Sequence, residues 1–131
     1  LAPSEMCIRD RGVELLRVHL TGYRLHIDGV FVMLAPDLAL VNIALLPFWF
    51  IEKLKELGIH LIEVYHEDDG WIINSLAIAP GRVMMPEGVS GYTMDRLLDH
   101  GIEVITVPYD KVMQGGGGLH CSTSPLIRDE V

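Results

Sequence analysis

The sequence contains one pattern twice, and this internal repeat constrains the fold more than any other feature. Residues 54–64 have the sequence LKELGIHLIEV, and residues 97–107 have the sequence LLDHGIEVITV, at an offset of 43. An Ala-Pro dipeptide at residue 35 recurs at residue 79, at an offset of 44. A repeat of this period indicates one supersecondary unit used twice, in a stacked or propeller-like architecture.

Each copy predicts the order strand, strand, helix, strand. The helix of the first copy has apolar residues at a spacing of three to four, and a glycine at its end favours a C-terminal cap. In the first copy we expect strands over 25–34, 38–45 and 59–65 and a helix over 47–57. In the second copy we expect strands over 71–79, 82–85 and 102–107 and a helix capped by Thr93 that runs to His100. Short strands are also expected over 17–23 and 119–125.

A run of glycines precedes a cysteine near the end of the chain, where residues 114–128 have the sequence QGGGGLHCSTSPLIR. Glycine lets a backbone approach a ligand closely, and the amides of such a loop stabilise negative charge. Cys121 is therefore a candidate nucleophile. The alternative is a flexible glycine linker before a tail with an inert thiol.

His26, Ile27 and Asp28 precede the first apolar strand. Residues i and i+2 of a strand share a face, so a histidine and a carboxylate are expected to project together as a general acid/base and a charge-binding group. His26 with Cys121 then gives a base and a nucleophile far apart in sequence. His120 adjoins Cys121 in an expected strand, so we place it on the opposite face and do not take it as the base. The alternative for this segment is an exposed polar pair at the start of a strand.

A zinc site made of His26, Asp28, His120 and Cys121 is a weaker alternative, because the sequence has neither CxxC nor HExxH spacing. Asn74 and its neighbour Ser75 interrupt an otherwise apolar strand. From the residue types alone, we interpret both as polar side chains that are hydrogen-bonded within the core.

Composition and charge limit the functional classes. The 131 residues suffice for one domain, and the formal net charge of −8 disfavours binding to nucleic acid. The apolar stretch 31–51 carries Asp37, Asn42 and two prolines, so buried strands and a helix fit better than a membrane span. Two cysteines make no disulfide framework, and the first residues lack a signal-peptide pattern, so we expect a cytoplasmic protein.

The first eleven residues show no clear periodicity. Residues 4–11, SEMCIRDR, resemble the translated read-through of a sequencing adapter. The resemblance implies that residues 1–11, with Cys7, are a non-native artefact and that 12–131 are the C-terminal fragment of one catalytic domain. An edge left open by missing units predicts self-association, so a homo-oligomer is possible.

The order of the His-Ile-Asp motif, the segment Asn74–Pro80 and the Gly-Gly-Gly-Leu-His-Cys motif resembles the C-terminal part of the guanidino-group-modifying enzymes of the pentein superfamily. That group includes arginine deiminases, agmatine deiminases, dimethylarginine hydrolases and amidinotransferases. The resemblance covers residues 22–131 and implies a five-bladed α/β propeller. This chain would supply two ββαβ blades and a C-terminal closing strand.

The resemblance also implies the chemistry of the site. Cys121 matches the nucleophile that attacks the guanidinium carbon, His26 the acid/base, and Asp28 a carboxylate that binds the guanidinium. Asn74 and the loop glycines Gly117 and Gly118 match further positions that bind the substrate, as does Arg128. No metal or organic cofactor is needed.

Two departures from the family pattern leave the reaction open. Further acidic residues of the family come from preceding blades that this chain lacks, so the fragment alone is expected to be inactive or nearly so. Gly116 stands where arginine deiminases carry an arginine, which resembles amidinotransferases and agmatine deiminases, whereas the tail 124–128 resembles arginine deiminases. We expect a hydrolase that converts arginine or a relative into a citrulline-type product and ammonia. The alternatives are an amidinotransferase, an inactive fragment, or a non-catalytic binding module such as a ribosome-associated factor of this fold.

Overall fold

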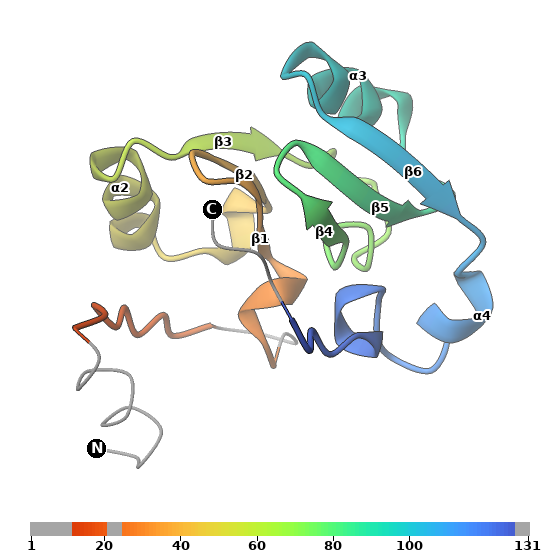
Figure 1. The fold of residues 1–131 in the computed structure, drawn as a ribbon, viewed down its shortest axis with the longest axis horizontal. Coiled ribbons are helices and arrows are strands. Elements are labelled where there is room, and N and C mark those ends of the chain that lie inside the picture. Colours follow the sequence, from red (N-terminus) through yellow and green to blue (C-terminus); the bar gives the residue numbers. More distant parts are fainter. Residues whose placement is uncertain (1–11, 21–24, 128–131) are drawn as a thin grey trace.

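The computed structural model describes residues 12–20 and 25–127, and it contains the repeated unit twice (Figure 1). The first unit consists of β1 (Phe31–Ala35), β2 (Leu38–Val41), α2 (Phe48–Glu56) and β3 (His60–Glu63). The second unit consists of β4 (Leu76–Ala79), β5 (Arg82–Pro86), α3 (Gly91–Asp99) and β6 (Glu103–Val107). The predicted order strand, strand, helix, strand is therefore confirmed in both copies.

The repeat extends to strand pairing. The sheets have the orders β1-β2-β3 and β4-β5-β6, and in each the first pair is antiparallel and the second parallel across the helix. The register shifts between Met33 and Ala35 in the first sheet and between Ala77 and Ala79 in the second. This irregularity falls at the Ala-Pro turn of each copy, where proline fixes the backbone and restricts the residue before it.

Glycines end both helices as the sequence predicted. Gly58 and Gly101 have φ angles of 75° and 74°, a left-handed conformation that glycine adopts without steric cost. The expected cap of the second helix is wrong by three residues. Ser90 caps α3 by accepting a hydrogen bond from the Thr93 amide, while the buried Thr93 hydroxyl donates to Asp68 and accepts from the amide of Tyr65. Thr93 thus links α3 to the chain that follows β3.

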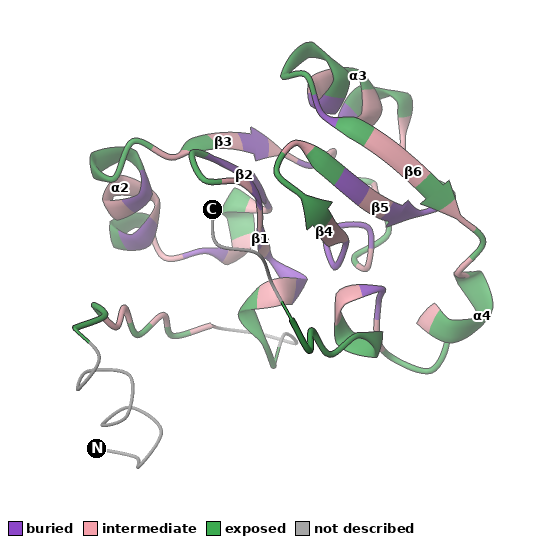
Figure 2. Cartoon of the chain, in the orientation of Figure 1, coloured by how far each residue is buried: buried purple, intermediate pink, exposed green. Residues whose placement is uncertain are grey.

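An apolar core joins the two units. It contains side chains from both sheets, from α3 and from the segment between the units: Val32, Leu34, Leu38, Leu40, Ile62, Val64, Ile72, Ile73, Val83, Met85, Leu97 and Ile102. A second cluster lies under α2 and contains Val30, Ala39, Val41, Leu46, Phe50 and Leu54. Figure 2 shows buried stretches on β2, β3 and β5, whereas the chain after α4 (Asp110–Met113) is largely exposed. β2 is buried at every residue because apolar side chains cover both of its faces.

Several expected strands are shorter than predicted or absent. Residues 27–29 form a 3-10 helix, η1 (Ile27–Gly29). Local hydrogen bonds such as Val30 N–H to Ile27 O (2.9 Å) take the place of hydrogen bonds to a neighbouring strand. β2 ends at Val41 and is followed by η2 (Ile43–Leu45), and residues 71–75 form turns before β4. Residues 17–20 carry no strand, and 21–23 lie outside the described residues.

The expected closing strand is also wrong. Its segment contains η3 (His120–Ser122) and irregular chain. Ser122 and Thr123 donate their hydroxyls to backbone carbonyls within the same segment, which favours a turn over pairing with another strand. Within the described ranges, no helix is long and apolar enough to cross a membrane.

We predict that Leu97→Ala in α3 destabilises the fold and that Leu98→Ala does not. Leu97 is fully buried in the core between the units, so truncation removes burial and leaves a cavity, at a cost of roughly 2–5 kcal/mol in the free energy of unfolding. Leu98 is 56% exposed, so its truncation is expected to change that value by about 0.5 kcal/mol or less. Urea unfolding followed by circular dichroism measures both. Equal losses would contradict the assignment of this core.

Candidate active site

Two segments from opposite ends of the chain meet at one end of the sheets. η1, which carries Asp28, precedes β1, and η3, which carries Cys121, follows the glycine run. Figure 1 shows the chain return from β6 through α4 and pass back to the side of η1. Each segment is a single 3-10 turn outside the sheets, so its side chains are placed by the contacts that hold its backbone.

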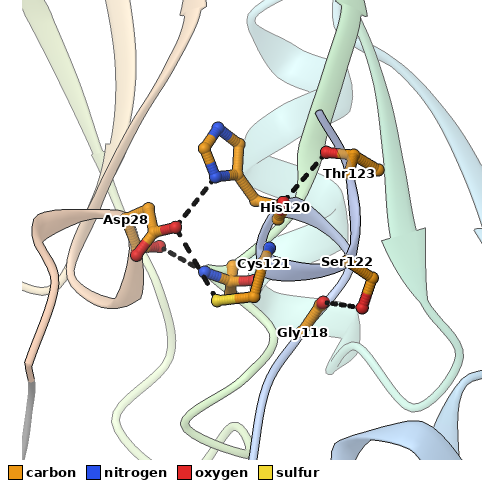
Figure 3. Close-up of polar contacts among 7 residues, drawn as sticks. Asp28, Gly118, His120, Cys121, Ser122 and Thr123 are labelled. Carbon is orange, nitrogen blue, oxygen red and sulfur yellow. Dashed lines mark hydrogen bonds and ion pairs between the residues drawn. The ribbon is translucent and has the colours of Figure 1, made fainter. Parts of the chain in front are cut away.

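A carboxylate, an imidazole and a thiol converge where these segments meet (Figure 3). One oxygen of Asp28, Oδ2, lies 2.8 Å from His120 Nδ1 and 3.7 Å from Cys121 Sγ. The Asp28 side chain is 20% exposed and that of His120 is 41% exposed, and Cys121 is exposed. The three groups therefore form an open site that a ligand can reach, with the carboxylate between two proton-bearing groups.

Asn74 lies beneath this site and is fully buried. Its Nδ2 donates to the backbone carbonyl of Asp28 (3.1 Å), and its Oδ1 accepts from the backbone amide of Cys121 (3.0 Å). Its own backbone carbonyl accepts from the amide of His120 (3.1 Å). One residue thus holds the backbones of all three site residues.

The glycines of the run have specific steric roles. A Cβ on Gly118 would lie 2.6 Å from Asn74 Oδ1 and 2.7 Å from Asn74 Cβ, closer than non-bonded atoms allow. A Cβ on Gly117 would lie 3.3 Å from Cys121 Cβ. Gly116 has a φ angle of 90°, which disfavours any other residue. The run brings the loop against Asn74, so the interpretation as a featureless linker does not fit.

Hydroxyl groups close the turn that presents the thiol. Ser122 Oγ donates to Gly118 O (3.0 Å), and Thr123 Oγ1 donates to His120 O (2.9 Å). These bonds satisfy backbone carbonyls that a strand partner would otherwise satisfy. They fix Cys121 at the exposed tip of the turn.

The structure brings together some of the predicted site residues and not others. Asp28 and Cys121 lie together as expected. Asn74 and Gly117 contact or adjoin Cys121, and Gly118 lies against Asn74. His26 is exposed, and the described side chains that contact the Asp28 carboxylate are those of His120 and Cys121. Arg128 lies outside the described residues.

His120 is the site residue that the sequence argument missed. An extended strand over this segment would place neighbouring side chains on opposite faces. In the 3-10 turn that exists here, His120 and Cys121 both reach Asp28 Oδ2. The Ser-Thr-Ser-Pro sequence after Cys121 was the available signal, because these residues favour turns.

The zinc alternative gains no support from this geometry. In residues 12–20 and 25–127, no three or more histidine, cysteine or acidic side chains are grouped so that they could hold a metal ion.

The arginine deiminase family model matches residues 50–128, more than half of the sequence. The chain belongs to the arginine deiminase family. The matched residues include Asn74, the glycine run and Cys121, and they begin after Asp28. The arginine deiminase of Mycobacterium marinum is 38% identical over 81 residues, which cover 60% of this chain and 20% of the relative. That of Staphylococcus epidermidis is 39% identical over 59 residues, or 44% of this chain and 14% of the relative. The chain thus spans a fifth or less of these family members.

Solved structures of guanidino-modifying enzymes share the fold. The amidinotransferase SxtG of Microseira wollei superposes with a TM-score of 0.80 at 19% identity, over 98% of this chain and 41% of that protein. The N-terminal domain of the cyanobacterial arginine dihydrolase ArgZ gives a TM-score of 0.75 at 20% identity, over 92% of this chain and 45% of that domain. The resemblance to the pentein superfamily is therefore confirmed at the level of the mixed α/β fold.

We predict that Gly118→Ala disturbs the site, whereas Gly91→Ala is tolerated. The new methyl group at residue 118 must displace Asn74 or the loop, at a cost of roughly 1–3 kcal/mol in the free energy of unfolding. A Cβ at Gly91, at the start of α3, meets no atom within 4 Å. Thermal unfolding of the two variants compares these costs. A Gly118→Ala protein as stable as Gly91→Ala would show that the loop does not press against Asn74.

Proposed function

We propose that the complete protein is a cysteine-dependent hydrolase of guanidino substrates that converts arginine or a close relative into a citrulline-type product and ammonia. The observation that supports this proposal is the 3.7 Å distance between Cys121 Sγ and Asp28 Oδ2 at an exposed position. A guanidinium is a planar cation whose N–H groups pair with a carboxylate. Held by Asp28, it would present its central carbon to the thiol beside it.

The proposed reaction has two stages. The Cys121 thiolate attacks the guanidinium carbon, and the C–N bond to a terminal nitrogen then breaks, so that ammonia leaves with a proton from the acid. Water next attacks the S-linked intermediate, gives a proton to the base, and releases the ureido product and the thiolate. We propose His26 as the acid and base on the strength of its motif, and Asp28 as the group that orients the cation throughout.

The His120 pair with Asp28 gives the free site an internal partner for the carboxylate. A substrate cation that pairs with the same oxygen competes with this contact. Gly117 would leave room for the substrate beside Cys121, and Gly118 lets the loop lie against Asn74. Arg128 offers a cation suited to a substrate carboxylate. No metal or organic cofactor takes part in these steps as proposed.

An amidinotransferase is the second candidate, because Gly116 lies where arginine deiminases carry an arginine and the Gly-Gly-Gly-x-His-Cys motif resembles transferases. In that reaction the other C–N bond breaks, so the whole amine portion of arginine leaves first. An amine, and not water, then takes the amidino group from Cys121.

We also propose that further copies of the repeated unit complete an α/β propeller. Tyr92 of α3 lies with its ring 5.2 Å from that of Tyr65 in the first unit. Trp49 occupies the matching position of α2, at the repeat offset of 43, and is as exposed as Tyr92, at 46% against 50%. A preceding unit could contact Trp49 as Tyr65 contacts Tyr92, and it would supply the remaining acidic residues of the site. The activity proposed here is that of the completed protein.

We predict that Cys121→Ala in the complete protein lowers the rate of citrulline formation from arginine by about 10³-fold or more, because the proposed covalent intermediate forms on the Cys121 thiol. Ser124→Ala, three residues further along exposed chain, is the matched control and is expected to retain activity. A colorimetric assay for citrulline gives both rates. Full turnover by Cys121→Ala would overturn the assignment of the nucleophile.

The two candidate reactions leave different adducts on Cys121. A deiminase intermediate retains the whole substrate except ammonia, whereas a transferase intermediate retains only the amidino group. We expect the first adduct when the complete protein reacts with arginine, is quenched in acid and is measured by intact mass spectrometry. The smaller mass would establish the transferase.

A further inference from the structure

We propose that Asn74 is a positioning residue, which sets the distance between the Cys121 thiol and the Asp28 carboxylate by holding both backbones from below. This inference rests on the proposed function, because it assigns a role within that reaction. It also differs from the expectation of a substrate contact. The Asn74 side chain is fully buried, and both ends of its amide bond to the backbone.

The position of Asn74 in the chain explains why one residue can serve both segments. It lies 46 residues from Asp28 and 47 residues from Cys121, on the turn that leads into β4. The two site segments belong to no common sheet or helix, so no regular backbone ladder fixes their separation. The Asn74 amide supplies that link, with one donor for the Asp28 carbonyl and one acceptor for the Cys121 amide.

The internal repeat separates this role from the needs of the fold. At the offset of 44, Asn74 corresponds to Val30, which is also fully buried and belongs to the apolar cluster under α2. The same place in the same unit is therefore filled by an apolar side chain in one copy and by an amide in the other. Only the second copy has the glycine run and the Cys121 turn against it. The amide at residue 74 is therefore explained by the site beside it, because the fold of the unit does not require a polar side chain there.

The chemistry of an amide suits this position. A buried donor or acceptor left without a partner costs roughly 1–3 kcal/mol, so a side chain here must match one carbonyl and one N–H group at once. Aspartate offers acceptors only and would face the Asp28 carbonyl with like partial charge. Gly118 completes the arrangement, because any larger residue would overlap Asn74.

Loss of this link is expected to loosen the approach of Sγ to Oδ2 more than it destabilises the protein. Ångström-scale misplacement of reacting groups lowers rates by about 10²-fold even when the groups themselves remain. His120 is held through the backbone carbonyl of Asn74, which substitution of the side chain keeps. The effect should therefore fall on the relation between Cys121 and Asp28.

Two alkylating reagents of the same shape test this relation in the complete protein. Chloroacetamidine carries an amidinium that Asp28 can bind, and chloroacetamide is its neutral counterpart. With either, a thioether forms at Cys121 and chloride leaves. Peptide mapping assigns the rate of each reagent at Cys121, and the chloroacetamidine rate is divided by the chloroacetamide rate. This ratio is then divided by the same ratio for N-acetylcysteine. The result reports how well the carboxylate directs a cation to the thiol.

We expect a normalised preference for the cation of tenfold or more in the wild type, and of less than about threefold in Asn74→Val, the residue that the first copy carries at this position. Asn74→Asp keeps the bond to the Cys121 amide but not the bond to Asp28, and its preference should also fall. Ser75→Ala is the matched control, because Ser75 is equally buried and bonds to Ile72 O and not to the site. Its preference should equal that of the wild type. Circular dichroism and thermal unfolding confirm that each variant is folded.

The outcomes separate the two proposals. A wild-type protein with no preference for the cation would overturn the proposed function, since Asp28 would then not direct cations to Cys121. A wild-type preference that persists in folded Asn74→Val or Asn74→Asp would overturn the positioning role alone. If the preference falls as far in Ser75→Ala as in the Asn74 variants, the positioning role would also be overturned. Loss of any buried polar side chain would then be enough to lower the preference. In support, kcat for arginine should fall by about 10-fold to 100-fold in the Asn74 variants, with a smaller change in KM.

Discussion

The apolar interface between the two units is the constraint on which the rest of the structure depends. A three-stranded sheet of four- and five-residue strands with one helix buries too little surface to be stable alone. Packing β1 and β2 against β5 and α3 through side chains such as Leu40, Met85 and Leu97 supplies a shared core. That packing also brings η1 and the turn that carries Asn74 to the same end of the sheets. The site therefore depends on the contact between the two units.

The polar site extends this packing by one layer. Immediately beyond the core residues Ile72 and Ile73, the chain turns and buries the amide of Asn74. A buried amide must find partners, and here its partners are the backbones of the two segments that carry Asp28 and Cys121. These hydrogen bonds offset the cost of burying the polar group, and they hold two stretches whose own secondary structure is a single 3-10 turn each.

The architecture could be predicted to a large extent because it follows from periodicity. Helices α2 and α3, the glycines that end them and the strands after them follow from local patterns, and the offset of 43 to 44 shows that they belong to equivalent units. The errors fall on segments without a ladder partner, at Ile27–Gly29 and His120–Ser122, where the expected alternation does not apply. His120 was excluded for that reason, although it lies 2.8 Å from Asp28.

The repeated unit, the positions of its turns and the types of residue available for chemistry can all be found in the amino-acid sequence. Each of these depends on neighbours a few places away, through strand and helix periods and the backbone freedom of glycine and proline. Long-range contacts place His120 and Cys121 against the same oxygen of Asp28, and they place Asn74 on the buried side of the site. These contacts join residues 46 to 93 positions apart, and a local pattern carries no information about which distant backbone groups will satisfy a buried amide.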